Sequence, residues 1–328
     1  MSQFGFETEG IDLVHQFSDR VKGCTFAITG PSAGGIGAET AVSLAHGHPA
    51  CLILIGRALD RIQPTIDAIH SIDSSIDVRF IQADLSSLSG SRNAARTILD
   101  DTAIPNIDVL INNAAVMACP YTLTPDNKLE LQLAAGHLGH FVLTNHLLPK
   151  LLPSPSGPPD GTPRSARVIN VSSVGNKAGG IRWSDPNFTL HPDEYSEFAA
   201  YGQAKTANVL FSIELNRRFA ARGLRSWALH PGSISTGLQK HITPDLVRDA
   251  TLKVFGTTTP NIKRKTLQQG CATTIRAALD PQLENEEGVF LNDCQLTTDP
   301  TYIAPWALDK EDAQRLWGWS EQLVGETF

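Results

Sequence analysis

A tyrosine and a lysine four positions apart, Tyr201 and Lys205, are the pair in this sequence best suited to acid–base chemistry. The stretch from Ala199 to Phe219 carries apolar residues at helical spacing, so it is predicted to be a helix with both side chains on one face. An ammonium beside a phenol favours the phenolate, and we therefore expect Lys205 to lower the pKa of Tyr201 from about 10. Such a phenol can exchange a proton with a substrate oxygen near neutral pH.

A glycine-rich turn lies near the start of the chain. The apolar run Thr25–Thr29 predicts a strand, and it leads into Gly30-Pro-Ser-Ala-Gly-Gly-Ile-Gly37 and then into a predicted helix. Strand, glycine turn and helix in this order can hold a phosphate chain, because glycine allows close backbone approach and the helix N-terminus supplies N–H donors. The sequence therefore predicts a dinucleotide-binding turn here.

The second predicted strand, Cys51–Gly56, is followed by Arg57. In a dinucleotide-binding fold this strand end meets the adenosine ribose, where an acidic residue favours NAD and an arginine accommodates the 2′-phosphate of NADP. The first acid after this strand is Asp60, so the sequence favours NADP(H). The alternative interpretation is that Arg57 is a solvated loop residue.

Apolar runs alternate with helical patterns along most of the chain. This alternation predicts an α/β fold, namely a doubly wound Rossmann-type parallel sheet with helices on both faces, in a single domain. Asp84 and Asn113 each follow a predicted strand, at the edge where such sheets bind ligands. Taken singly, each residue would be a loop cap, but their shared position favours contacts with adenine and ribose.

The predicted domain runs from residue 23 to residue 328 and follows an N-terminal helical arm, residues 1–22. Two long segments, 174–200 and 237–265, are expected to be irregular and to cover the active site. The first segment carries apolar and aromatic side chains that favour an apolar substrate: Ile181, Trp183, Phe188, Tyr195 and Phe198.

Composition argues against several classes of function. The 328 residues carry a net charge of −7 without a basic stripe, so we expect no nucleic-acid partner. The longest apolar runs have the length of strands, so we expect no membrane anchor and take the cytoplasm as the default location. The five cysteines are scattered and lack a C-x-x-C pair, which predicts free thiols in a reducing compartment.

Two histidines, His137 and His140, lie three positions apart in a predicted helix. Such a pair could share a metal ion, but the sequence offers no third ligand at a suitable spacing. We therefore predict no metal site and assign these histidines to packing and capping.

Taken together, these motifs resemble the short-chain dehydrogenase/reductase superfamily from about residue 23 to residue 295. The matching motifs, in order, are residues 29–37, residues 112–115, Ser173, the Tyr201/Lys205 pair and Pro231-Gly232. The stretches HLGHFVLTNHLLP, AYGQAKTANVLFSIEL and LHPGSISTGL also resemble the branch that contains retinol dehydrogenases and chloroplast-envelope reductases. That branch favours NADP(H), in agreement with Arg57.

The resemblance implies a role for each matching residue. Tyr201 would be the general acid/base, Lys205 would lower its pKa and hold the nicotinamide ribose, and Ser173 would donate to the substrate oxygen. The other implied cofactor contacts are Gly30, Ser32, Gly35, Ile36 and Gly37 at the pyrophosphate, Asp84 at the adenine, Asn113 at the adenosine side, and Ile234 with Thr236 at the nicotinamide end.

The chain departs from the family pattern at two places. Its glycine turn is one residue longer than usual, because Gly34 and Gly35 both precede Ile36. The family's fourth catalytic residue, an asparagine before His-Leu-Gly-His, is Gly136 here. In relatives that asparagine supports a water on the proton path, which the carbonyl of Gly136 could still hold.

We predict an NADP(H)-dependent oxidoreductase that interconverts a carbonyl and an alcohol on an apolar small molecule. A non-catalytic NADP(H)-binding protein, such as a redox sensor or assembly partner, is the alternative that Gly136 favours. A nucleotide-sugar dehydratase or epimerase would be expected to have a larger C-terminal domain than the residues after Thr236 provide. A homo-oligomer paired through the helices near residues 127–148 and 199–219 stays open.

Overall fold

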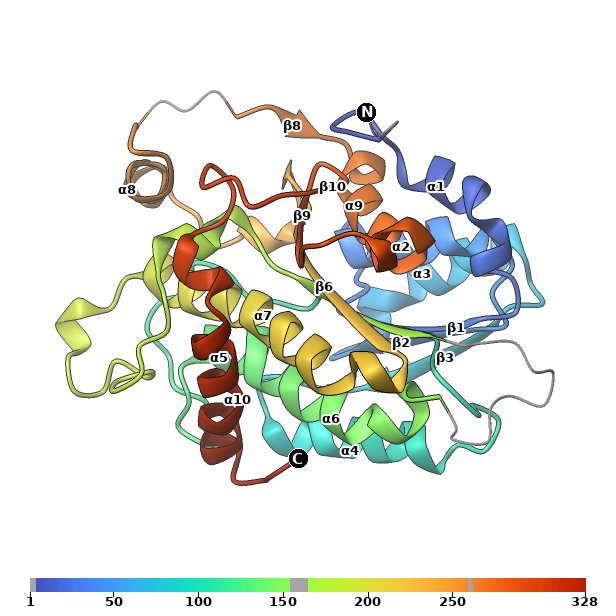
Figure 1. Cartoon of the computed structure of the whole chain (residues 1–328), viewed down its shortest axis with the longest axis horizontal. Helices are drawn as coiled ribbons and strands as arrows, with labels where there is room; N and C mark the ends of the chain where they lie inside the picture. The colour runs from blue at the N-terminus through green and yellow to red at the C-terminus, as the bar shows by residue number, and fades with distance from the viewer. Residues whose placement is uncertain (1–3, 154–164, 259–261) are drawn as a thin grey trace.

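A single sheet forms the centre of the molecule (Figure 1). The computed structural model describes residues 4–153, 165–258 and 262–328, and within these ranges eight strands form this sheet in the order β10-β9-β6-β5-β4-β1-β2-β3. All neighbouring strands are parallel except β9 and β10. The strands are β1 (Thr25–Thr29), β2 (Cys51–Gly56), β3 (Asp77–Gln82), β4 (Val109–Asn112), β5 (Ala166–Val171), β6 (Leu224–His230), β9 (Phe290–Asn292) and β10 (Gln295–Leu296).

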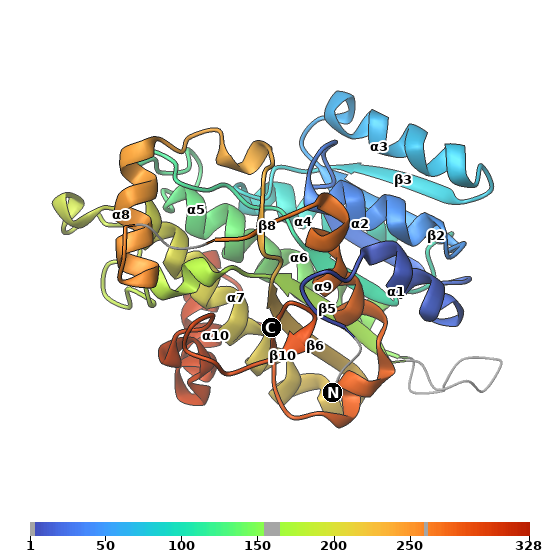
Figure 2. The same cartoon turned by 90° about the horizontal axis from the view of Figure 1, so that it is seen from above.

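Helices cover both faces of this sheet (Figures 1 and 2). One face is covered by α1 (Gly10–Gln16), α2 (Ile36–Ala45), α3 (Leu59–Ile72) and α9 (Leu267–Leu279). The other face is covered by α4 (Leu88–Asp100), α6 (Gly139–Leu151), α7 (Glu197–Phe219) and α10 (Lys310–Val324). The strands β1, β2 and β4 are buried on both faces and are nearly continuous apolar runs, whereas the edge strand β3 is only half-buried. The predicted doubly wound α/β fold is confirmed.

The predicted N-terminal arm packs closely onto this core. Leu13 and Val14 of α1 are fully buried, and α1 lies across α9. Gly10 makes that close crossing feasible, because a Cβ at this position would collide with the Sγ atom of Cys271. Further upstream, the Phe6 ring lies 4.9 Å from the ammonium nitrogen of Lys265. Residues 1–3 of the predicted arm are outside the described residues.

The prediction that residues 237–265 are irregular is wrong for much of the segment. A twelve-residue helix, α8 (Pro244–Phe255), lies within it, and β8 (Arg264–Lys265) pairs with β7 (Ser233–Ile234) in a small second sheet. The helix starts where the Thr243 hydroxyl accepts from the Leu246 N–H, and it ends at Gly256 with φ +69°. In both views α8 and the segment near residue 190 lie at the same end of the molecule (Figures 1 and 2). Residues 259–261 are outside the described ranges.

The predicted helix over residues 127–148 begins later and is not uniform. It starts as one turn, α5 (Leu131–Leu133), widens into a π-helical turn over residues 134–138, and continues as α6. Gly136 lies within the π-helical turn. None of the helices among the described residues is long and apolar enough to cross a membrane.

The C-terminal helix α10 covers the outer surfaces of α6 and α7. Its Trp317 is 1% exposed and lies 5.1 Å from the ring of Phe141, 5.9 Å from Phe211 and 6.1 Å from Phe219 between ring centroids. The guanidinium of Arg218 stacks 4.1 Å from the same indole. The chain's own C-terminal helix thus occupies the aromatic face that α6 and α7 share.

Removal of the Trp317 side chain is expected to destabilise the fold. Trp317→Ala should lower the free energy of unfolding by about 3–5 kcal/mol, because it removes a large buried side chain and leaves a cavity between three aromatic rings. Gln314→Ala on the exposed side of α10 should change it by less than about 0.5 kcal/mol. Urea unfolding followed by far-ultraviolet circular dichroism measures the free energy of unfolding of both variants. Equal stability of the two variants would contradict this role of α10.

Candidate active site

The parallel strands bring most of the predicted site residues to one edge of the sheet. In-register pairing places the end of β1 beside the ends of β2 and β4, and the end of β5 beside the end of β6. The predicted residues that lie one or two positions past the strand ends at this edge are Gly30, Arg57, Asp84, Asn113 and Ser173. The N-terminal half of α7 adds Tyr201 and Lys205 beside the end of β5.

Tyr201, Ser173 and Lys205 form one buried group. The Lys205 ammonium donates to the carbonyl of Val171, the last residue of β5, at 2.7 Å, and it lies 5.5 Å from the centroid of the Tyr201 ring. The Tyr201 ring and the Ser173 Oγ both lie against Gly175, where a Cβ would be 2.8 Å from the Cε1 atom of the ring and 3.3 Å from the Oγ, and the interaction with the Ser173 side chain favours the phenolate. The N–H of Gly175 donates to the Ser173 Oγ at 3.0 Å, which leaves the serine O–H proton able to donate elsewhere.

Burial dominates the titration of this group. It raises the pKa of Tyr201 to about 12, and the interaction with the Ser173 side chain opposes this increase only in part. Burial also lowers the pKa of Lys205 to about 7. The expectation that Lys205 lowers the pKa of Tyr201 is therefore wrong for the protein alone. Removal of each group from water outweighs the attraction that their spacing suggested, and Lys205 is only partly charged near neutral pH.

The glycine turn has the shape of a phosphate cradle. Gly30 has φ +67°, and a Cβ there would lie 2.9 Å from the Cα atom of Ala114, so only glycine fits between β1 and the segment after β4. Gly35 precedes α2 and offers no side-chain cap, so the first N–H groups of the helix, those of Ile36 and Gly37 among them, are not capped by a side chain. The additional residue is accommodated at Gly34, which has φ +74° and open space around it.

Asn113 holds the strand ends together. Its amide donates to the carbonyls of Thr29 at 2.8 Å and Gly30 at 3.3 Å, and its Nδ2 atom lies where a Cβ of Gly37 would be. The Thr29 hydroxyl in turn accepts from the N–H groups of Asn113 and Ala114, each at 2.9 Å. Asn113 was predicted as a contact to adenosine, but its amide nitrogen serves to fix the glycine turn against β4.

The other predicted cofactor residues lie near this edge and differ in exposure and in hydrogen-bond partners. Arg57 is exposed, and its carbonyl accepts from the Gln82 side chain at 3.0 Å. The Asp84 carboxylate accepts from the N–H and hydroxyl of Ser86 at 3.0 and 2.7 Å, so it caps its own turn. Beyond β6, Ile234 is 7% exposed in β7. The Thr236 hydroxyl accepts from the Leu238 N–H at 3.3 Å, and Ser32 is half-buried in the glycine turn.

Gly136 contacts the helix that carries Lys205. A Cβ at this position would lie 3.2 Å from the Cβ of Ala204, which is tighter than most packed contacts, so a side chain here would require the π-helical turn and α7 to separate slightly. The Gly136 carbonyl, expected to be available for a water, interacts with Nδ1 of His140 at 3.3 Å. His140 also contacts the Thr29 hydroxyl at 2.9 Å, and His137 contacts Ser320 at 2.9 Å. Burial lowers the pKa of His140 to about 4, so this ring is neutral at pH 7.

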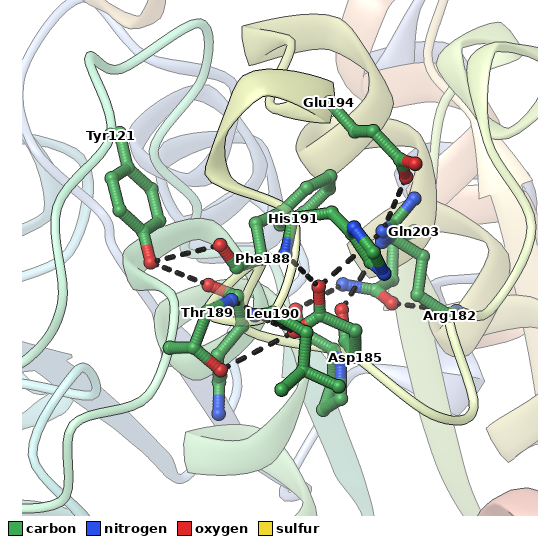
Figure 3. Close-up of polar contacts among 11 residues, drawn as sticks. Tyr121, Arg182, Asp185, Phe188, Thr189, Leu190, His191, Glu194 and Gln203 are labelled. Atoms are coloured by element: carbon green, nitrogen blue, oxygen red, sulfur yellow. Dashed lines mark hydrogen bonds and ion pairs between the residues drawn. The ribbon is translucent and has the colours of Figure 1, made fainter.

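The segment between Ser173 and α7 is fixed by a buried carboxylate (Figure 3). Asp185 is 3% exposed and accepts from the N–H groups of Thr189, Leu190 and His191 at 2.8–3.2 Å. Burial opposes its charge, but these backbone donors hold the pKa of Asp185 below its usual range. Arg182 extends the network by donating to Glu194 at 2.8 Å.

This segment is also fastened to the elements around it. The buried Gln203 of α7 accepts from the Arg182 N–H at 2.8 Å and donates to the Pro186 carbonyl at 3.0 Å (Figure 3). From the other side, the Tyr121 hydroxyl donates to the Asn187 carbonyl at 2.8 Å. The segment is thus a fixed wall, and sequence reasoning missed both Asp185 and Gln203 because their partners are backbone groups.

Three of the apolar side chains of this wall pack against the protein, unlike the interpretation drawn from the sequence. Phe188 is fully buried beneath the guanidinium of Arg182, 4.3 Å from the ring centroid. Trp183 packs on Trp319 of α10 with ring centroids 5.6 Å apart, and Ile181 joins the same cluster. These residues therefore stabilise the wall, and they do not argue for an apolar substrate.

Known proteins resemble this chain over most of its length. A family model described as short chain dehydrogenase matches residues 25–185. The short-chain dehydrogenase/reductase prx1 of Penicillium rubens is 36% identical, over 93% of this chain and 86% of that protein. Retinol dehydrogenase 12 of Bos taurus is 34% identical, over 92% of this chain and 87% of that protein. Among solved structures, an uncharacterized protein from Mycobacterium paratuberculosis is 30% identical with a TM-score of 0.66, over 94% of this chain and 95% of that one.

The buried lysine makes stability depend on pH in a defined direction. The pKa of Lys205 is about 7 in the folded protein against an ordinary value of 10.5, so between these values the unfolded chain binds more protons than the folded one. The free energy of unfolding of the wild type should therefore increase relative to that of Lys205→Met as pH rises from 7 to 10. Urea titrations across this range test it, with Lys310→Met at an exposed position as control. A stability difference between the two proteins that stays constant with pH would contradict a lowered pKa of Lys205 in the folded protein.

Proposed function

The chain belongs to the short-chain dehydrogenase/reductase family, and on that premise we propose that it is an NADP(H)-dependent oxidoreductase that interconverts a carbonyl and an alcohol. The observation that carries the proposal is the buried group in which the Tyr201 phenol meets the Ser173 hydroxyl, with the Lys205 ammonium 5.5 Å from the phenol ring. A proton donor, a second hydrogen-bond donor and a cation at the ligand-binding edge are the parts that carbonyl reduction needs.

The residues present suit a nicotinamide dinucleotide. The glycine turn and the start of α2, which has no side-chain cap, would hold the pyrophosphate. The Lys205 ammonium donates one N–H to Val171 and has two N–H donors left for ribose hydroxyls. Asp84, Asn113, Ile234 and Thr236 would flank the adenosine and nicotinamide ends. When bound, the cofactor supplies or accepts the hydride.

Arg57 supports NADP(H) over NAD(H). Its side chain is exposed at the carboxyl end of β2, where the 2′-phosphate of the adenosine ribose is placed in this type of fold. A guanidinium in this place favours a phosphate by charge and by paired N–H donors.

The proton chemistry would belong to Tyr201. With a pKa of about 12, its phenol is protonated at neutral pH and is ready to protonate an alkoxide, which is the proton step of carbonyl reduction. The Ser173 O–H would donate to the same substrate oxygen as negative charge develops on it. Lys205 would bind and orient the ribose beside the phenol.

For the substrate we propose an apolar carbonyl or alcohol. The support comes from the similarity to a retinol dehydrogenase, since retinol is an apolar alcohol. The inward packing of Trp183 and Phe188 removes the argument that the sequence offered for the same substrate class.

Gly136 favours a second candidate, a non-catalytic NADP(H)-binding protein. One lone pair of its carbonyl faces His140, which leaves a single acceptor site for the water expected on the proton path, and no side chain at this position can support that water. Loss of this water would leave cofactor binding intact but would slow the transfer of protons behind Lys205. The intact set of Ser173, Tyr201 and Lys205 argues for the enzyme.

Replacement of the phenol separates these candidates. Purified wild-type protein should oxidise NADPH in the presence of at least one member of a broad carbonyl panel. Tyr201→Phe should lower that turnover about a hundredfold or more with NADPH binding retained, because it removes only the general acid. Tyr121→Phe makes the same chemical change at an exposed phenol and should alter turnover less than tenfold. Cofactor binding without any turnover by the wild type would establish the non-catalytic alternative.

A further inference from the structure

The main chain of Ser173 is held by a buried asparagine three residues later. Asn176 is fully buried, and its side-chain amide donates to the Ser173 carbonyl at 2.7 Å. The backbone N–H of Asn176 donates to the same carbonyl at 3.0 Å. Two donors on one carbonyl, together with the Gly175 N–H on the Ser173 Oγ, leave the serine little freedom to rotate.

The other bonds of Asn176 reach a segment more than a hundred residues away. Its amide nitrogen also donates to the Tyr302 carbonyl at 3.1 Å, and its Oδ1 atom accepts from the Ala304 N–H at 2.8 Å. The indole N–H of Trp306 donates to the Asn176 carbonyl at 3.3 Å. This segment is itself anchored, because Ile303 is 1% exposed.

The same asparagine meets the helix that carries the proposed acid. The hydroxyl of Thr206, which follows Lys205, lies 3.1 Å from the Asn176 carbonyl and 2.8 Å from the Gly179 carbonyl, and its one proton is shared between these two acceptors. Gly175 lies directly against the Tyr201 ring, where a Cβ at residue 175 would be 2.8 Å from the Cε1 atom. A shift of residues 173–176 would therefore change the separation of the serine hydroxyl and the phenol.

We propose that Asn176 is a positioning residue, which sets the Ser173 hydroxyl relative to Tyr201 by tying the serine main chain to residues 302–304. The proposal rests on the proposed function, in which Ser173 and Tyr201 are the reacting groups. Displacement of a reacting group by about 1 Å can cost about a hundredfold in rate, and Asn176 connects the three units that determine this distance.

Two substitutions and a matched control test the kinetic effect. Asn176→Ala removes the whole connection, whereas Asn176→Asp keeps an acceptor for the Ala304 N–H and loses both donors. Asn216→Ala is the control, because Asn216 also bridges two backbone groups, the N–H and carbonyl of Ser226 at 2.8 and 2.7 Å, at the far end of α7. Both Asn176 variants should lower kcat by about ten- to a hundredfold with KM for NADPH changed less than threefold. Asn216→Ala should leave kcat within threefold.

A second measurement is independent of turnover. Hydrogen exchange of the Gly175 amide, which is bonded to the Ser173 Oγ, should accelerate at least tenfold in the Asn176 variants and stay unchanged in Asn216→Ala. Trp306→Phe removes only the indole donor at a partly exposed position, so it should accelerate this exchange about threefold even if neither Asn176 variant folds.

The outcomes separate the two proposals. Faster Gly175 exchange with lower kcat supports the positioning role. A wild type that turns over no carbonyl overturns the proposed function, and Gly175 exchange then decides alone whether Asn176 positions Ser173. Unchanged exchange in the variants, or an equal loss of kcat in Asn216→Ala, overturns the positioning role.

Discussion

The contact between the end of β5 and the middle of α7 is the constraint on which the site depends. The Lys205 ammonium donates to the Val171 carbonyl at 2.7 Å, and the Ser172 hydroxyl donates back to the Lys205 carbonyl at 2.7 Å. Asn208, one helical turn later, donates a second side-chain hydrogen bond to the Val171 carbonyl at 3.2 Å. Strand and helix are thus joined reciprocally through buried polar groups, which fixes the position of Ser173 relative to Tyr201.

Burial at this contact has an electrostatic consequence. The free energy needed to bury an ammonium is lowered when the group gives up its proton, so the pKa of Lys205 falls to about 7, while the pKa of Tyr201 rises to about 12. Perturbation in this direction is common where chemistry is performed, because reacting groups must be both fixed and shielded. The segment after β5 supplies part of that shielding, since Gly175 lies against the Tyr201 ring and the Val171 carbonyl contacts the Lys205 ammonium.

The sequence contained enough information for the fold and for the edge at which the site lies. Strands covered on both faces are continuous apolar runs, and glycine at residue 30 is required by contacts that a Cβ would destroy, so both leave a local signal. The start and end of α8 also leave a local signal, Thr243-Pro244 and Gly256, but the prolines of this segment favour irregular backbone when the sequence is considered alone.

Features that depend on distant partners could not be read from the sequence. The inward packing of Trp183 requires Trp319, and the role of Asn176 requires Tyr302 and Ala304. The prediction that the pKa of Tyr201 is lowered was wrong for a related reason. Spacing on a helix shows that an ammonium is near, whereas the stronger effect, the loss of water around both groups, comes from elements packed on α7 from elsewhere in the chain.

Direct binding of NADPH and NADH to the purified protein tests the central claim, because it needs no knowledge of the substrate. The account predicts tighter binding of NADPH, and a loss of about tenfold in NADPH affinity alone in Arg57→Ala, as expected for a partly solvated charge pair. Arg96→Ala, an exposed arginine on α4, should bind both cofactors as the wild type does. Binding of neither cofactor by the wild type would contradict the account, since the glycine turn and the uncapped start of α2 would then hold no dinucleotide.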